Sequence, residues 1–139
     1  MDILRRTAKP VVLTPHAGEF ARLSGKPDAT AADAAQFAQD YRCIVLYKGH
    51  RTRIFTPDGA CYRNTSGNPG MAKGGSGDVL AGMTAALLAC RLPAYEAAAC
   101  AVYLHGAAAD RTAAKLGEYG MLPHDILPEL GQMFAENRR

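Results

Sequence analysis

A glycine-rich stretch in the middle of the chain combines the residue types that phosphate chemistry requires. Gly74, Gly75, Ser76 and Gly77 come directly before an acid, Asp78, and a long uncharged segment. Glycine accepts a positive φ, so a loop of this kind turns its backbone N–H groups toward one point. A helix that begins after Gly77 adds the positive end of its dipole there. The stretch therefore predicts an anion-binding loop, and phosphate is its natural occupant.

Asp78 would repel a phosphate held in the same pocket. We therefore expect it beside the phosphate, where its carboxylate takes a proton from a hydroxyl, as in phosphoryl transfer. A second interpretation stays open for these residues alone: a turn followed by a helix whose first turn carries an acid that interacts with the dipole. The loop is neither a Walker A motif nor a dinucleotide fingerprint, because no Lys-Ser or Lys-Thr pair and no Gly-x-Gly-x-x-Gly is present.

Length and charge limit what the chain can be. Its 139 residues are 48% hydrophobic, which suffices for one modest core and predicts one domain over residues 1–139. The net charge of +3 is small and its basic residues gather near the two ends, so we expect no nucleic-acid partner. We interpret residues 1–9 and 136–139 as flexible ends.

Membrane insertion and metal binding through cysteine are not indicated. The longest uncharged run, residues 79–90, is shorter than the roughly 20 apolar residues that a bilayer requires, and no signal peptide opens the chain. We therefore expect a cytoplasmic protein without membrane contact. The cysteines form no Cys-x-x-Cys pair, and we expect them to be reduced core residues: Cys43, Cys61, Cys90 and Cys100.

The elements that must position the loop follow from local patterns. Short apolar runs predict buried strands at 11–14 and 43–47, and Pro57-Asp58-Gly59 predicts the turn of a hairpin between 53–56 and 60–63. Helical spacing predicts four helices, at 30–41, 78–90, 96–116 and 126–134, and a loop at 117–121. Thr30 with Asp33 is the predicted cap of the first helix, and Asp125 is that of the last. The helix at 78–90 is apolar on every face, so we expect it buried between two layers. The order predicts an α/β fold.

Three segments also resemble a known family in the order in which its motifs occur. They are Leu13–Leu23, the Leu-x-Lys-Gly pattern that includes Lys48, and Asn64–Gly82. The chain resembles, over about residues 11–134, the ADP/ATP-dependent NAD(P)H-hydrate dehydratases of the ribokinase-like superfamily. The resemblance implies a three-layer α/β/α fold. Members have a domain about twice as long, so this chain corresponds to its C-terminal half.

The resemblance also implies roles for individual residues. Asp78 would be the catalytic base and would contact the substrate, and His16 would contact the hydrated nicotinamide nucleotide. Glu19 occupies the place of an acid that helps to hold Mg²⁺ through water. The residues implied in binding ATP or ADP are Lys48, Gly49, His50, Arg51, Thr52, Gly74, Gly75, Ser76 and Gly77. The His105-Gly106 and Asp110 pattern also matches, but we expect structural roles for these residues, namely an interhelix hydrogen bond and a close crossing.

The implied reaction is the repair of hydrated NADH or NADPH. The hydroxyl that the added water leaves on the nicotinamide ring is a poor leaving group, and its phosphorylation by ATP or ADP makes it a good one. Two alternatives remain open: a kinase of the same superfamily acting on a sugar or vitamin precursor, and a non-catalytic fragment that binds nucleotide or assembles. The missing half should leave the strand at 11–14 and an apolar helix face uncovered, so we expect a homo-oligomer.

Overall fold

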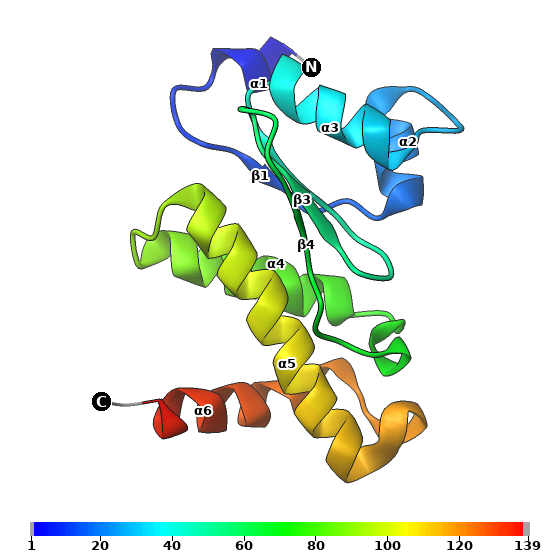
Figure 1. Cartoon of the computed structure of the whole chain (residues 1–139), viewed down its shortest axis with the longest axis vertical. Helices are drawn as coiled ribbons and strands as arrows, with labels where there is room; N and C mark the ends of the chain where they lie inside the picture. Colours follow the sequence, from blue (N-terminus) through cyan, green and yellow to red (C-terminus); the bar gives the residue numbers. More distant parts are fainter. Residues whose placement is uncertain (1, 138–139) are drawn as a thin grey trace.

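The computed structural model describes residues 2–137 and contains one mixed four-stranded sheet with helices on both faces (Figure 1). The strands lie in the order of the chain, with β1 parallel to β2 and the other pairs antiparallel. The predicted strands and the hairpin are confirmed, as is the α/β class. Their bounds are β1 (Val12–Leu13), β2 (Ile44–Tyr47), β3 (Arg53–Phe55) and β4 (Cys61–Arg63).

Helices α2 and α3 cover one face of the sheet, whereas α4 and α5 pack against the other (Figure 1). Helix α6 packs on the far end of α5, away from the strands. The helices are α1 (Asp2–Arg6), α2 (Ala17–Ser24), α3 (Ala31–Asp40), α4 (Ser76–Ala89), α5 (Ala94–Gly120) and α6 (Ile126–Glu136), with the 3₁₀ turns η1 (Pro69–Met71) and η2 (Pro123–Asp125). No helix in residues 2–137 is both long and apolar enough to cross a bilayer.

The layer formed by α2 and α3 is a small aromatic core. Phe20 of α2 is fully buried, and its ring meets that of Phe37 of α3 edge to face, with centroids 5.5 Å apart. Helix α3 begins with the predicted capping box, in which Thr30 Oγ1 accepts from the Asp33 N–H and the Asp33 carboxylate accepts from the Thr30 N–H. This layer fixes the position of α2, whose first turn reaches the carboxyl end of β1.

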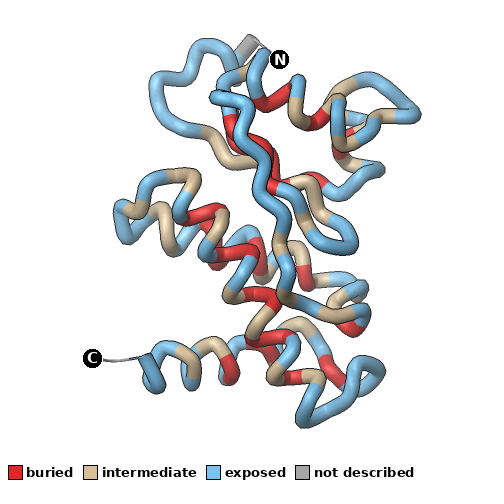
Figure 2. The backbone as a smooth tube through the Cα atoms, in the orientation of Figure 1, coloured by how far each residue is buried: buried red, intermediate tan, exposed pale blue. Residues whose placement is uncertain are grey.

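Helix α4 is buried on one side only. Leu80 and Met83 pack against the sheet and α5, but the side that carries Ala81, Gly82 and Ala85 is exposed (Figure 2). The prediction that α4 is buried between two layers is therefore wrong for this chain, because nothing among residues 2–137 covers its outer side. The related expectation of an uncovered strand and helix face is confirmed, since β1 is an edge strand of the sheet.

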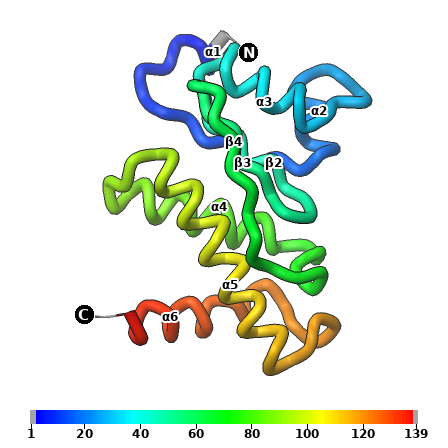
Figure 3. Tube along the Cα trace, in the orientation of Figure 1, coloured from blue at the N-terminus to red at the C-terminus, as the bar shows by residue number. Residues whose placement is uncertain are grey.

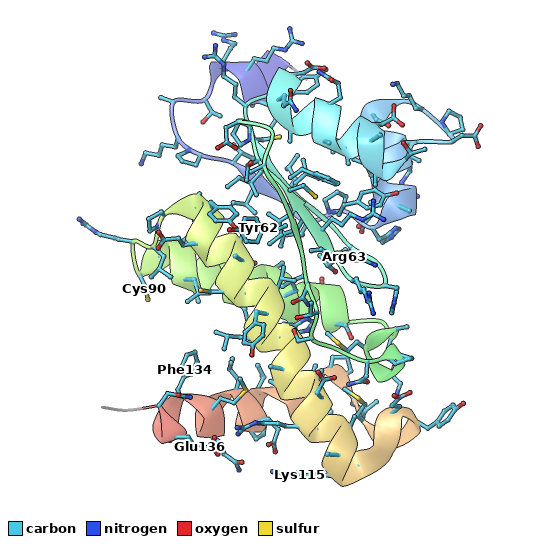
Figure 4. The ribbon with its side chains drawn as sticks, in the orientation of Figure 1. Tyr62, Arg63, Cys90, Lys115, Phe134 and Glu136 are labelled. Carbon is cyan, nitrogen blue, oxygen red and sulfur yellow. The ribbon has the colours of Figure 1, made fainter. Side chains whose placement is uncertain are left out.

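Helix α6 is likewise covered in part. Ile126 is fully buried against α5, whereas Leu127 and Phe134 are about half exposed (Figure 4). The buried Glu129 carboxylate lies 2.6 Å from Lys115 Nζ of α5, which compensates its charge. Only part of the apolar face predicted for this helix is therefore buried, namely the part that meets α5.

Two local expectations need correction. The segment 117–121 is not an open loop, because α5 resumes after Gly117, whose φ of 72° and ψ of 156° break the helix, and continues to Gly120. Asp125 precedes α6 as predicted, but its carboxylate accepts from the Leu122 N–H and does not cap that helix. Residues 2–6 form helix α1, while Met1, Arg138 and Arg139 lie outside the described residues.

The cysteines are free, as predicted, but three of the four are exposed. Cys43 is buried beside β2, where burial raises the pKa of its thiol to about 11. Cys61 lies on the edge strand β4, Cys90 lies at the end of α4 (Figure 4), and Cys100 faces solvent on α5. The expectation of core positions is wrong for these three, because each lies on an outer surface of a structure with few layers.

His105 lies in the middle of α5, is only 5% exposed, and its Nε2 has no hydrogen-bond partner among residues 2–137. The interhelix hydrogen bond that we expected is therefore not made by Nε2. Burial lowers the pKa of the imidazole to about 4 from its ordinary 6.5. In the folded protein the His105 ring therefore stays neutral down to about pH 4. In the unfolded chain the same ring takes up a proton near pH 6.5.

Acidification should therefore destabilise the protein through His105. The free energy of unfolding should fall by about 1–2 kcal/mol between pH 7 and pH 5, because the unfolded chain binds more protons over that interval. Urea titrations at pH 7, 6 and 5 measure this change, and His105→Leu should flatten it. The carboxyl groups with lowered pKa values, such as that of Glu136, change the free energy of unfolding only below about pH 4.5. They therefore do not contribute to the change between pH 7 and pH 5. An equally steep loss in His105→Leu would contradict the assignment.

Candidate functional site

A cavity of about 600 Å³ lies where β1 and β2 end, between the first turns of α2 and α4. Segments that are far apart in sequence line it, and the colours of Figure 3 show that α2 and α4 come from different parts of the chain. The carboxyl ends of parallel strands are the usual place for ligands in α/β folds. The cavity is lined by Leu13, Thr14, Pro15, His16, Glu19, Leu23, Lys48, Lys73, Gly74, Gly75, Gly77, Asp78 and Ala81.

The two strand ends are locked together at the cavity. The Lys48 N–H donates to the Pro15 carbonyl at 2.8 Å, and His16 pairs with Lys48 as an isolated parallel bridge. His16 also caps α2, because its Nδ1 accepts from the Glu19 N–H at 3.2 Å while Glu19 Oε2 accepts from the His16 N–H at 2.7 Å. This capping box holds the imidazole ring at the wall of the cavity.

Glu19 contacts two basic groups as well as the capping N–H. Its Oε1 lies 3.5 Å from His16 Nε2, and its Oε2 lies 3.3 Å from Lys48 Nζ. The backbone hydrogen bond from His16 and the Lys48 ammonium lower the pKa of the Glu19 carboxyl. Glu19 is therefore an ionised residue that links α2 to the end of β2.

The glycine-rich loop differs from its prediction in backbone detail. Of its three glycines only Gly75 has a positive φ, at 97°, and it precedes α4 as the N-cap. Gly77 is already helical because α4 begins at Ser76, so the expectation of a positive φ at Gly74 and Gly77 is wrong. Gly77 instead allows a close approach, since a Cβ there would lie 3.0 Å from Lys48 Nζ.

Asp78 is the third residue of α4 and is exposed at the cavity. Its N–H donates to the Gly75 carbonyl, which closes the first turn of the helix. Within residues 2–137 its carboxylate has no ion-pair or hydrogen-bond partner, so both oxygens are available to a ligand. The carboxylate thus lies beside the N–H groups of α4 without occupying them.

The stretch predicted to bind the nucleotide is divided by the structure. Lys48 lines the cavity, whereas Gly49, His50, Arg51 and Thr52 form the turn between β2 and β3 outside it. Arg51 adopts a left-handed φ of 58°, which is uncommon for a residue other than glycine. Ser76 is buried beneath the loop and does not line the cavity.

Lys73 is a cavity residue that the sequence analysis missed. Its Nζ donates to the carbonyls of Glu118 at 3.1 Å and Tyr119 at 2.9 Å, and also to that of Met121. A cation is favourable at this place because the carbonyl end of a helix carries partial negative charge. Lys73 thereby ties the glycine-rich loop to the end of α5. Its position beside the glycines was the only signal in the sequence, because its partners lie more than 40 residues away.

Helix α5 also holds the beginning of the loop. Asp110 accepts from the Gly67 N–H at 2.8 Å and from Asn68 Nδ2 at 2.9 Å. Gly106 allows the chain to pass close to the helix, since a Cβ there would lie only 2.7 Å from the Ser66 carbonyl carbon. The expected structural roles of Gly106 and Asp110 are confirmed, with the loop before α4 as the contacted element.

The residues present do not form a Mg²⁺ site by themselves. No group of three His, Cys, Asp or Glu side chains among residues 2–137 could hold a metal ion. Both Glu19 oxygens lie within 3.5 Å of donors of this chain, one of them the Lys48 ammonium. Direct coordination by Glu19 therefore does not fit, and Mg²⁺ would have to rely on nucleotide phosphates and water.

A mixed sheet whose strand ends meet a glycine-rich helix start defines the ribokinase-like class, and solved structures confirm this fold. A ribokinase-like superfamily protein from Enterococcus faecalis matches 91% of this chain and 44% of its own at a TM-score of 0.80 and 40% identity. Phosphofructokinase-2 from Escherichia coli shares the fold alone, with a TM-score of 0.54 and 16% identity over 89% of this chain and 40% of its own.

Within this class the chain belongs to the NAD(P)H-hydrate dehydratase family, whose pattern matches residues 2–132. It is 40% identical over 133 residues to the ADP-dependent (S)-NAD(P)H-hydrate dehydratase of Bacillus subtilis, which is 90% of this chain and 48% of that protein. The crystal structure of the B. subtilis ADP/ATP-dependent NAD(P)H-hydrate dehydratase, co-crystallised with ATP and Mg²⁺, matches 95% of this chain and 51% of its own at a TM-score of 0.81 and 35% identity. The resemblance stated above is thereby confirmed.

The chain spans about half the length of the B. subtilis dehydratase and a smaller share of longer relatives. The bifunctional NAD(P)H-hydrate repair enzyme of Moorella thermoacetica is 47% identical over 123 residues, which are 85% of this chain and 23% of that protein.

Proposed function

We propose that this chain provides the phosphate-binding and proton-accepting half of an NAD(P)H-hydrate dehydratase that consumes ATP or ADP. One observation carries the proposal: a single cavity brings His16, Lys48 and Gly75 together with Asp78, whose carboxylate has no partner among residues 2–137. The family of the chain supports the same conclusion.

The geometry suggests a sequence of events for these side chains. The hydroxyl of the hydrated nicotinamide ring lies against Asp78, which takes its proton as the oxygen attacks the terminal phosphorus of the nucleotide. The bond from that phosphorus to the bridging oxygen breaks, and ADP leaves when ATP is the donor or AMP when ADP is the donor. The N–H groups at the start of α4 and the Lys48 ammonium stabilise the charge on the transferred phosphoryl group. Loss of phosphate, together with a proton from the neighbouring ring carbon, restores the reduced nucleotide. His16, held by its capping box, contacts the nicotinamide nucleotide. Gly49, His50, Arg51 and Thr52 lie outside the cavity, and their proposed contact with ATP or ADP rests on the family of the chain alone.

Nucleotide binding tests this proposal on the chain itself. ATP and ADP should bind to this chain, because the loop and the start of α4 are contiguous in sequence and already folded. The affinity should be weak. Gly77→Val should abolish binding, because its side chain would displace the Lys48 ammonium and crowd the first turn of α4.

Isothermal titration calorimetry measures both affinities, and Gly82→Val is the matched control. Gly82 lies on the same helix and has no atom near its Cβ position, so that variant should bind like the parent. Absence of heat with millimolar nucleotide and the parent chain would contradict the proposal.

Self-association is the second part of the proposal. The edge of β1 and one side of α4 are left uncovered by residues 2–137. The B. subtilis relative is about twice as long, so it has additional chain that can cover such surfaces. We expect a homodimer or larger oligomer that buries at least roughly 1,200 Å², as stable interfaces do. Light scattering at micromolar concentration checks this, and a folded monomer would disprove it.

A further inference from the structure

Glu19 and Lys48 form an ion pair that joins α2 to the end of β2 at the wall of the cavity. Glu19 Oε2 lies 3.3 Å from Lys48 Nζ, and the same oxygen accepts from the His16 N–H at 2.7 Å. The Lys48 side chain is 22% exposed, so it is directed by its surroundings rather than extended into water. Its ammonium therefore occupies a defined place.

That place is electrostatically unusual for a lysine. The ammonium lies against the first turn of α4, where a Cβ on Gly77 would be only 3.0 Å away. The amino end of a helix carries partial positive charge, so it repels a cation. Glu19 compensates this repulsion from one side, whereas the other side opens into the cavity that Asp78 also lines. A phosphate entering the cavity would meet the ammonium and the helix N–H groups together.

We infer that Glu19 is a positioning residue, which holds the Lys48 ammonium at the amino end of α4 so that both contact the same phosphate group of the nucleotide. This inference rests on the proposed function, and it assigns to Glu19 a task other than binding Mg²⁺. A glycine at position 77 leaves room for this arrangement, since a Cβ there would lie 3.0 Å from the ammonium.

Glu19→Gln separates this task from helix capping. Glutamine can still accept from the His16 N–H, because capping boxes use Glu or Gln at this position. The substitution therefore keeps the capping box and removes only the charge that holds Lys48. The thermal unfolding midpoint should stay within a few degrees of the parent, which excludes a general loss of structure.

Chemical labelling tests, without any nucleotide, whether Glu19 holds the Lys48 ammonium in place. Acetylation with limiting acetic anhydride, followed by mass spectrometry, should modify Lys48 several-fold faster in Glu19→Gln than in the parent. Lys26 is the internal control, because it pairs with Asp33 and not with Glu19. An unchanged Lys48 rate would overturn the inference, whether or not the chain binds nucleotide.

Affinity for ATP then tests the consequence for binding. Glu19→Gln should weaken ATP binding by about tenfold, the cost of one misplaced charged hydrogen bond, equally with Mg²⁺ and with EDTA. In a Lys48→Met background the same substitution should have no further effect. A loss confined to Mg²⁺ would assign Glu19 to the metal, and tighter binding would show simple repulsion of phosphate; either result overturns the inference. If the parent does not bind ATP, the proposed function fails, and the labelling experiment alone decides whether Glu19 holds Lys48.

Discussion

Asp78→Asn is expected to lower the rate of hydrated NADH or NADPH repair by about 10² to 10⁴-fold, the usual cost of losing one general base. Asparagine keeps the size of the side chain at the third position of α4 but cannot accept the hydroxyl proton. The carboxylate has no partner among residues 2–137, so its removal leaves no other group unsatisfied. Affinity for ATP should therefore change by no more than a few-fold.

The measurement should include a complete domain as well as the chain alone, because the chain spans about half of its B. subtilis relative. We would assay the chain alone and a hybrid in which residues 2–132 replace the matching half of that dehydratase, following the return of NADH absorbance. Asp28→Asn is the matched control, since it changes an exposed carboxylate outside the cavity and should leave the rate unaltered. Near-normal turnover by Asp78→Asn in an active hybrid would remove Asp78 from the mechanism.

Gly106→Ala is expected to produce the largest loss of stability of any Gly→Ala substitution in the chain. The new Cβ would lie 2.3 Å from Ser66 Oγ, 2.7 Å from the Ser66 carbonyl carbon and 2.8 Å from its oxygen. The neighbouring backbone is itself bonded to Asp110 and cannot move aside without losing that contact. Overpacking of this kind costs about 1–3 kcal/mol, and more where the backbone must shift.

Urea unfolding of the parent and variant measures this loss. Gly82→Ala is the matched control, because Gly82 is also helical, its Cβ position is open, and alanine should stabilise the helix by about 0.5–1 kcal/mol. The two substitutions add the same methyl group with opposite expected signs. A neutral Gly106→Ala would show that the segment before η1 is free to move away from α5.

Local patterns were sufficient to predict most elements of the fold. Strand β1 ends before Pro15, the hairpin turns at residues 57–59 and α3 begins after Thr30, because these residues act on the backbone within a few positions. Burial was predicted less well, since the exposed side of α4 depends on which layers are present and not on its own apolar composition. The exposed positions of Cys61, Cys90 and Cys100 have the same cause.

The candidate site could be predicted as a set of residues but not as a geometry. Asp78 was identified by its type and context, and His16 and Lys48 through the family resemblance, and the structure brings all three to one cavity. The pairing of Lys48 with Glu19, and the contact of Lys73 with the end of α5, join residues that no spacing rule connects. The role of Gly77 was misjudged for the same reason, because its neighbour is a lysine 29 positions earlier.

The strand order β1-β2-β3-β4, in which every strand pairs only with its neighbours in the chain, has a consequence for how the protein forms. The β2–β3 and β3–β4 pairings close short loops, and the β1–β2 pairing closes the segment that contains α2 and α3, so no strand has to wait for residues beyond β4. Pairings between segments that are near in sequence generally form fast. The sheet can therefore assemble progressively as the chain leaves the ribosome, before α5 is complete. The loop before α4 cannot be fixed at that stage, because Asp110 and the carbonyls that hold Lys73 are synthesised later. Competence to bind phosphate should thus appear last, and a stopped-flow refolding experiment should show sheet formation ahead of recovery of nucleotide binding.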